Sequence, residues 1–205
     1  MKNKLKYMAL CLSLLIGVGA CSEEEIAYSA GEENKEVILQ LNCQLQTNQE
    51  VIVSRASTAE NRLNDLHFYV FNAAGELTGY KKLVATESSP IPTPGPETVT
   101  VKAITGEAYI YALANLNSTI YYLDDADKNK LTGIDEADVA GSSLTRDEFL
   151  AIDFKRQYGN ASHIISPNPT DGQFMMSGYL NGGKAVTITA GTNGAGVISE
   201  SNVIR

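Results

Sequence analysis

Cysteine is scarce in this chain, and the positions of its three cysteines limit what they can form. Cys11 lies inside an apolar segment near the start, Cys21 follows that segment, and Cys43 alone lies in the body of the chain. Once a leader is removed and Cys21 is modified, one thiol remains, which excludes an intramolecular disulfide and a thiolate metal cluster. The mature fold must therefore be held together by a hydrophobic core.

Basic residues are also few. The 16 Lys and Arg face 24 Asp and Glu, which gives a net charge of −8, or −11 without Lys2, Lys4 and Lys6. A nucleic-acid partner requires a basic face, so we exclude nucleic acid as a partner. An acidic surface suits a protein that stays soluble outside the cell.

The sequence also lacks the arrangements that carry catalysis. His67 and His163 are far apart, and neither stands in an H-x-x-x-H or H-E-x-x-H motif. No G-x-S-x-G motif is present, and the glycines of residues 191–196 have the wrong spacing for a dinucleotide loop, so a turn is expected there. We predict a protein that is not an enzyme and binds no cofactor, with both histidines as ordinary strand or loop residues.

One acidic segment resembles a calcium loop in part. Asp125, Asp127, Asn129 and Glu136 occupy positions 1, 3, 5 and 12 of an EF-hand pattern, but Lys130 stands at position 6, where the pattern requires glycine. A lysine there also places positive charge beside the bound cation. We therefore expect a solvated acidic loop here rather than a metal site.

The first residues have the features of a bacterial lipoprotein leader. A basic start precedes the apolar segment MALCLSLLIGVG, which is shorter than the ~20 residues that a membrane-spanning helix needs. The next residues, Val18 to Cys21, resemble a lipobox, which predicts a signal peptide at residues 1–20 and acylation of Cys21. Residues 21–35 are expected to form an acidic tether, in which Ser22 to Glu25 resembles the surface-export signal of Bacteroidetes lipoproteins.

Alternation of apolar and polar residues predicts a series of short strands. In residues 36–46 one face carries Val37, Leu39, Leu41, Cys43 and Leu45, which is typical of a half-buried strand. Further strands are expected at residues 66–77, 97–104, 107–115, 174–178 and 184–190, and from residue 196 onward. The strands at 66–77 and 107–115 are apolar on both faces, so we expect them in the centre of a sheet.

Signals for helices are rare. Four prolines in residues 88–97 predict a loop, and Thr145 with Glu148 forms a capping box that predicts one short helix. The fold class is therefore all-β, an antiparallel β-sandwich with one or two short helices. We expect this domain to span residues 36–190, and residues 191–205 to begin a second, truncated domain.

Several segments, taken in order, resemble a known family. After the lipobox and first strand come Arg55 before the small Ala56, then a strand ending in Tyr-Val-Phe with a glycine turn. A tyrosine-rich strand ending in Ala-Asn and a Met-Ser-Gly at residues 176–178 follow. This order is similar to that of the fimbrillin family of Bacteroidetes, the FimA-like and Mfa1-like subunits of type V pili. The resemblance implies a Greek-key, transthyretin-like sandwich and a structural role in adhesion.

The resemblance also implies a route of assembly. Fimbrillins reach the cell outer membrane as lipoproteins, a trypsin-like protease cuts after an arginine, and the groove left by the first strand accepts a donor strand from the next subunit. Here the cut is expected between Arg55 and Ala56, with Arg62 as a second accessible arginine. Other fimbrial subunits are then the partners, host or bacterial surface ligands are possible ones, and an anchor subunit would keep its lipid.

Elementary energetics supports that route independently. Burying the alternate apolar side chains of residues 36–46 stabilises the fold by roughly 10 kcal/mol as an upper bound. Removing this strand leaves an apolar groove flanked by unpaired backbone groups, and strand addition from another chain refills it.

A monomeric surface lipoprotein that binds glycan or host protein is the alternative. Its sugar platform would be built from Tyr109, Tyr111, Tyr121 and Tyr122. The strand pattern around Tyr109 and Tyr111 favours core and interface roles for these aromatic residues instead.

Overall fold

The computed structural model describes residues 34–43, 63–88, 91, 97–116, 121–153, 155–156, 176–199, 201 and 203–204. Every described residue belongs to one compact unit, Glu32–Arg205. The predicted lipid attachment at Cys21, the predicted cut between Arg55 and Ala56, and both Arg62 and His163 lie outside the described residues.

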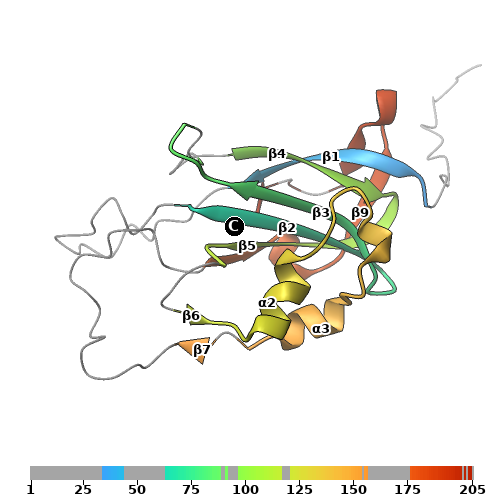
Figure 1. The fold of residues 1–205 in the computed structure, drawn as a ribbon. Coiled ribbons are helices and arrows are strands. Elements are labelled where there is room, and N and C mark those ends of the chain that lie inside the picture. Colours follow the sequence, from blue (N-terminus) through green and yellow to red (C-terminus); the bar gives the residue numbers. More distant parts are fainter. Residues whose placement is uncertain are drawn as a thin grey trace, which may run out of the picture. The chain divides into compact units, whose positions relative to one another are not determined.

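Two β-sheets form the body of the fold (Figure 1). The first has the order β11 (Val203–Ile204), β1 (Glu36–Cys43), β4 (Glu97–Ile104). The second has the order β10 (Gly196–Ile198), β9 (Val186–Ala190), β5 (Gly106–Ala114), β2 (Asp65–Asn72), β3 (Leu77–Val84), and β8 (Met176–Tyr179) also pairs with β5. Only the pairing of β1 with β11 is parallel among these described ladders. The predicted all-β, antiparallel sandwich is thus confirmed.

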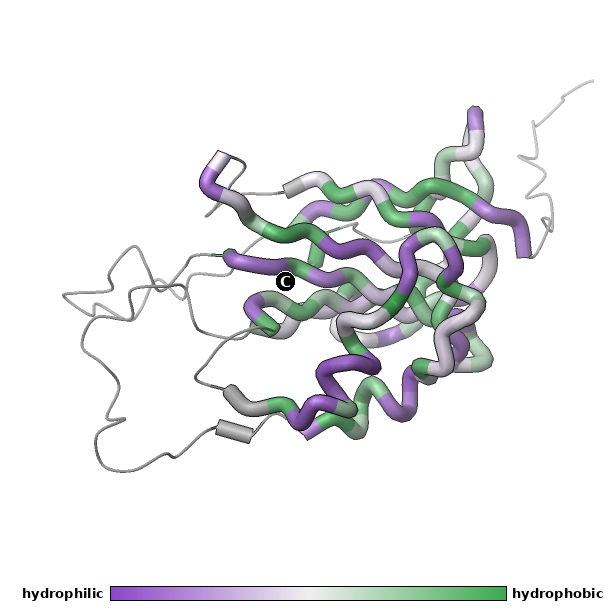
Figure 2. The backbone as a smooth tube through the Cα atoms, in the orientation of Figure 1, coloured by the Kyte–Doolittle hydropathy of each residue, from purple (hydrophilic) through white to green (hydrophobic). Residues whose placement is uncertain are grey.

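The first core fills the space between the two sheets. Its residues are the inward side chains at alternate positions, such as Leu39 of β1, Val101 of β4, Phe68 of β2 and Ile110 of β5. Because side chains on a strand alternate between faces, each of these strands presents every second residue to the core. Figure 2 shows this as hydrophobic segments interspersed with polar ones along β1 and β4.

A second core covers the opposite face of β2, β3 and β5. It lies between the sheet and the helices α2 (Asp125–Thr132) and α3 (Arg146–Ala151). Both helices lie on the side of the sheet away from β1 and β4 (Figure 1), and Val139 of the 3-10 turn η1 (Val139–Gly141) packs against this core. The ring of Phe149 lies 4.9 Å from that of Tyr69, 5.4 Å from Phe71 and 5.2 Å from Tyr111, measured between centroids. Strands β2 and β5 are therefore buried on both faces, as their sequences predict.

The two helices differ in how far the sequence predicts them. The capping box that starts α3 is present, with Thr145 accepting from the Glu148 amide and the Glu148 carboxylate accepting from the Thr145 amide. The expectation of a solvated acidic loop at 125–136 is wrong, because residues 125–132 form α2. Asp124 caps this helix, and Leu131 is its buried side chain, which packs an otherwise polar helix against the second core.

Two glycines allow the sheets to meet at their edges. At Gly79 of β3, a Cβ atom would overlap the carbonyl oxygen of Lys102 in β4. At Gly196 of β10, a Cβ atom would lie 2.5 Å from Leu39 Cδ2 and 2.9 Å from Val37 Cγ2 of β1. The strands of the two sheets can therefore approach this closely at Gly79 and Gly196 only because these residues carry no side chain.

The C-terminal residues join this sandwich. The predicted turn at residues 191–196 is present as η4 (Thr192–Gly194), with positive φ at Asn193 and Gly194. Beyond it, β10 pairs with β9 and β11 pairs with β1. The expectation that residues 191–205 begin a second domain therefore differs from the structure, in which the described part of that segment adds a strand to each sheet.

Candidate assembly site

Strand β1 is the element on which the predicted assembly depends. It runs antiparallel to β4 along its whole length, with Val37 opposite Ala103, Leu39 opposite Val101 and Leu41 opposite Val99. The three apolar side chains of β1 are 1%, 0% and 0% exposed in that order. This strand is therefore a full member of the core rather than an appendage to it.

The other side of β1 has much less strand pairing. Among the described residues, β11 pairs with it at Asn42 and Cys43, and a parallel bridge joins Ile38 to Ala195. Over most of its length, the ladder that holds β1 is thus the one with β4. Withdrawing β1 would separate β4 from β11 and empty the space that its three apolar side chains fill.

Gly196 forms part of the wall of that space. Its α-carbon lies against the side chains of Val37 and Leu39, so the shape of the wall depends on glycine at this position. Sequence reasoning missed this residue, although a glycine inside a strand pattern is a known sign of close backbone approach.

The outer face of β1 is mostly polar, with Ile38 as its apolar residue, and two of its side chains contact side chains of β4. Lys102 Nζ lies 3.3 Å from Glu36 Oε1, and Thr98 Oγ1 donates to Asn42 Oδ1 at 2.9 Å. The Lys102 and Glu36 side chains are 56% and 67% exposed, so water screens their attraction. These contacts fix the register of β1 on β4 more than they add stability.

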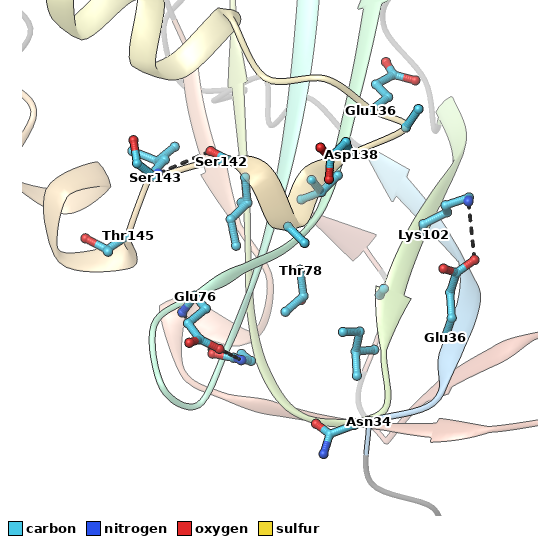
Figure 3. A pocket seen from close by; sticks show the side chains of 18 residues that line it. Asn34, Glu36, Glu76, Thr78, Lys102, Glu136, Asp138, Ser142, Ser143 and Thr145 are labelled. Carbon is cyan, nitrogen blue, oxygen red and sulfur yellow. Dashed lines mark hydrogen bonds and ion pairs between the residues drawn. The ribbon is translucent and has the colours of Figure 1, made fainter.

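A cleft of about 810 Å3 lies beside the first residues of β1 (Figure 3). Glu36 and Lys102 stand on one side of it, and the segment around η1, the start of β3 and the ends of β2 and β4 also line it. No aromatic residue is found among the described residues that line it, so it offers no stacking platform for a sugar ring.

The carboxylates of the cleft already have partners. Glu136 accepts from Lys81 Nζ and from the Lys82 amide, both at 2.8 Å, and Asp138 accepts from the Gly141 amide at 3.2 Å. Partial burial alone would raise the pKa of Glu136, but these hydrogen bonds from Lys81 and Lys82 outweigh it and lower the pKa below its ordinary value. The contact with the Lys82 amide also covers part of the edge of β3.

The tyrosines considered as a sugar platform are engaged in packing where they are described. The hydroxyl of Tyr111, which is 6% exposed, accepts from Arg146 Nε at 3.0 Å. The guanidinium of Arg146 lies 3.7 Å from the centre of the Tyr109 ring, a cation–π contact that fastens α3 to β5. The side chains of Tyr121 and Tyr122 lie outside the described residues.

The candidate calcium ligands are not arranged as a loop. Asp125, Asp127 and Asn129 lie on α2, and Glu136 pairs with Lys81 beyond the end of that helix. Among the described residues, no group of three His, Cys, Asp or Glu side chains is placed to hold a metal ion. Likewise, none of the described helices is long and apolar enough to cross a membrane.

His67 belongs to a buried polar cluster. Its Nδ1 lies 2.8 Å from the Tyr80 hydroxyl, and its Nε2 lies 3.3 Å from Asp65 Oδ1, which also accepts from the Leu116 amide. Burial is the main cause that raises the pKa of Tyr80, and the negative charges of Glu136 and Asp65 add to it. This cluster connects β2, β3 and the end of β5, which is a structural role.

Comparison with known proteins relates the chain to fimbrial subunits. Residues 42–203 match the family model described as "Major fimbrial subunit protein (FimA)". A search of curated proteins found no match.

Two solved structures show limited likeness. The tip fimbrial protein Mfa3 from Porphyromonas gingivalis, with a C-terminal truncation, is 17% identical with a TM-score of 0.46, over 78% of this chain and 43% of that one. A protein from Parabacteroides distasonis, described as a candidate cell adhesion protein, is 13% identical with a TM-score of 0.38, over 85% of this chain and 40% of that one. This chain thus spans less than half the length of either.

Proposed function

Because the chain belongs to the family of FimA major fimbrial subunits, we propose that it is a structural pilus subunit, exported as a lipoprotein and assembled by strand exchange. In this proposal it has no enzymatic activity and works on the outer surface of a bacterium, first at the outer membrane and then in the fimbrium. Its partners are other fimbrial subunits, and the assembled fimbria serve adhesion to host or bacterial surfaces.

The burial and pairing of β1 are the observations that most directly support strand exchange. Val37, Leu39 and Leu41 are buried in the core, yet within the described part of the chain β11 pairs with β1 at two positions. Burying these three side chains stabilises the fold by about 5–9 kcal/mol as an upper bound. That is comparable with the whole stability of an ordinary domain, so an emptied slot would be refilled by any strand of matching chemistry.

The order of the sequence features supports the processing step. Cys21 precedes β1 and Arg55 follows it, so one cut after Arg55 would release the lipid and β1 together. The remaining chain would keep β4, β11 and the entire second sheet. In this proposal residues 1–20 are the signal peptide, residues 21–35 the tether, and Ala56 the first residue of the assembled subunit.

Analysis of protein released from the surface of a pilus-forming bacterium tests the proposal. We expect a ladder of bands on sodium dodecyl sulfate electrophoresis without boiling, and an N-terminal sequence that begins at Ala56. The Arg55→Ala variant should lose both the ladder and the new terminus. The Arg62→Ala variant is the matched control and should keep them.

Two outcomes would contradict the proposal. Monomers that retain an acylated Cys21 and give no ladder would instead support the monomeric lipoprotein. A ladder that persists in Arg55→Ala but disappears in Arg62→Ala would move the cut to the second arginine. Mass spectrometry of the Cys21→Ser variant, which should lack the acyl groups, tests the lipid attachment separately.

A further inference from the structure

We infer that the slot occupied by β1 selects an entering strand by side-chain size, through Gly196, and that this strand carries three alternate aliphatic residues. The inference rests on the proposed strand exchange and names the chemistry of its partner. In the register of β1, the aliphatic positions are those of Val37, Leu39 and Leu41.

The residues that line the slot limit the size of the side chains that can enter it. Because an added Cβ at Gly196 would lie 2.5 Å from Leu39 Cδ2, the Leu39 side chain already fills the space up to the glycine backbone. A smaller side chain there leaves a cavity, while a larger one collides with β10. The second aliphatic position therefore requires a side chain of about the size of leucine.

The facing residues of β4 are consistent with this selection. Ala103, the smallest of them, lies opposite Val37, which is also the second contact of Gly196. Val101 and Val99 face the two leucines. A branched residue of the size of valine thus fits the first position, and an aliphatic residue of the size of leucine fits the third.

Polar contacts on the outer face are compatible with this register. Lys102 faces an acid at the position of Glu36, as Figure 3 shows, and Thr98 donates to an amide at the position of Asn42. The entering strand must also run antiparallel to β4 and parallel to β11. A strand slipped by one residue would present its polar face to the core.

Peptide exchange into the full chain, cut after Arg55 with an arginine-specific protease, tests the inference. The probe is a labelled peptide of residues 34–43, and its variants carry Leu39→Ala, Leu39→Phe or Glu36→Lys. We expect the Leu39→Ala peptide to bind about 100-fold more weakly and the Leu39→Phe peptide about tenfold more weakly. The Glu36→Lys peptide should lose no more than about fivefold, because that ion pair is exposed.

The Gly196→Ala variant of the chain provides the diagnostic comparison. It should weaken binding of the unsubstituted peptide about tenfold and binding of the Leu39→Ala peptide by less, because only the contact with Val37 then remains. Equal binding of the leucine, alanine and phenylalanine peptides would overturn the inference. A loss on Gly196→Ala that is equally large for the leucine and alanine peptides would do the same.

The uncut chain separates this inference from the proposed function. There, Gly196→Ala alone should raise the unfolding constant about tenfold. In a chain that already carries Leu39→Ala, it should raise that constant by a smaller factor, because only the contact with Val37 remains. If the effects of these two substitutions on the free energy of unfolding are additive, the slot does not select by size, whatever peptide binding to the cut chain shows. If they are coupled but no peptide enters the cut chain, strand exchange is wrong and the size restriction holds for β1 itself.

Discussion

Replacing Leu39 with alanine measures how firmly β1 is held in the core. The Leu39 side chain is fully buried and contacts the wall formed by Gly196, so the surrounding residues have little room to close a cavity. Leu-to-Ala changes at such sites combine a transfer loss of about 0.8 kcal/mol per methylene with a cavity loss. We expect the free energy of unfolding of the uncut chain to fall by about 3–5 kcal/mol.

Ile38→Ala is the matched control for this substitution. Ile38 is the next residue on the same strand, it pairs with β4 in the same ladder, and it is 38% exposed on the outer face. Its replacement removes a similar number of carbons from a much less buried site, so we expect a loss of about 1 kcal/mol. The difference between the two variants therefore reports burial and not strand propensity.

Equilibrium urea unfolding followed by far-ultraviolet circular dichroism is the assay. The dependence of free energy on urea concentration should remain the same in both variants, so that the midpoints report stability alone. A difference of less than about 1 kcal/mol between Leu39→Ala and Ile38→Ala would refute the seating of β1 in the core. It would also remove the physical basis of the proposed strand exchange.

Three further predictions concern the contact between β3 and β4, the N-terminal cap of α3 and the carboxylate at the edge of β3. Gly79→Ala should cost about 3 kcal/mol in urea unfolding, because its methyl group would overlap a backbone oxygen of β4, and a loss below 0.5 kcal/mol would contradict that close approach. Thr145→Ala should cost about 1 kcal/mol by removing the cap of α3, whereas an unchanged midpoint would show that the capping box adds nothing. Since the folded pKa of Glu136 is lowered, its stabilisation is present above the ordinary carboxyl pKa of 4.5 and is lost as pH falls through the folded value. The difference in unfolding midpoint between the chain and Glu136→Gln should therefore shrink on acidification below pH 4.5, and a constant difference would contradict the assignment.

The strands of the sandwich could be predicted because their signals are local. Val37, Leu39 and Leu41 alternate with polar residues, and the two-faced pattern of β2 matches its burial between two cores. The start of α3 is equally local, because a capping box needs only residues three apart.

Other features depend on contacts between distant residues. Helix α2 has a mostly polar sequence and is held by Leu131, whose carbonyl accepts from the Tyr69 hydroxyl at 2.9 Å. The role of Gly196 depends on a strand that lies far away in the sequence. Neither contact produces a periodic pattern in the sequence. The sequence therefore predicted a loop where α2 lies, and it predicted that Gly196 belongs to a second domain.

The carboxylate of Glu136 has a consequence for how such subunits could join. It takes up the outward amide hydrogen of Lys82 on β3, a donor that a foreign strand would otherwise use, while the adjacent Lys81 charge is held in place by the same group. If chains connect through the slot of β1, this blocked flank discourages lateral sticking and branching. A filament built from such units would then lengthen in a single line instead of clumping into sheets.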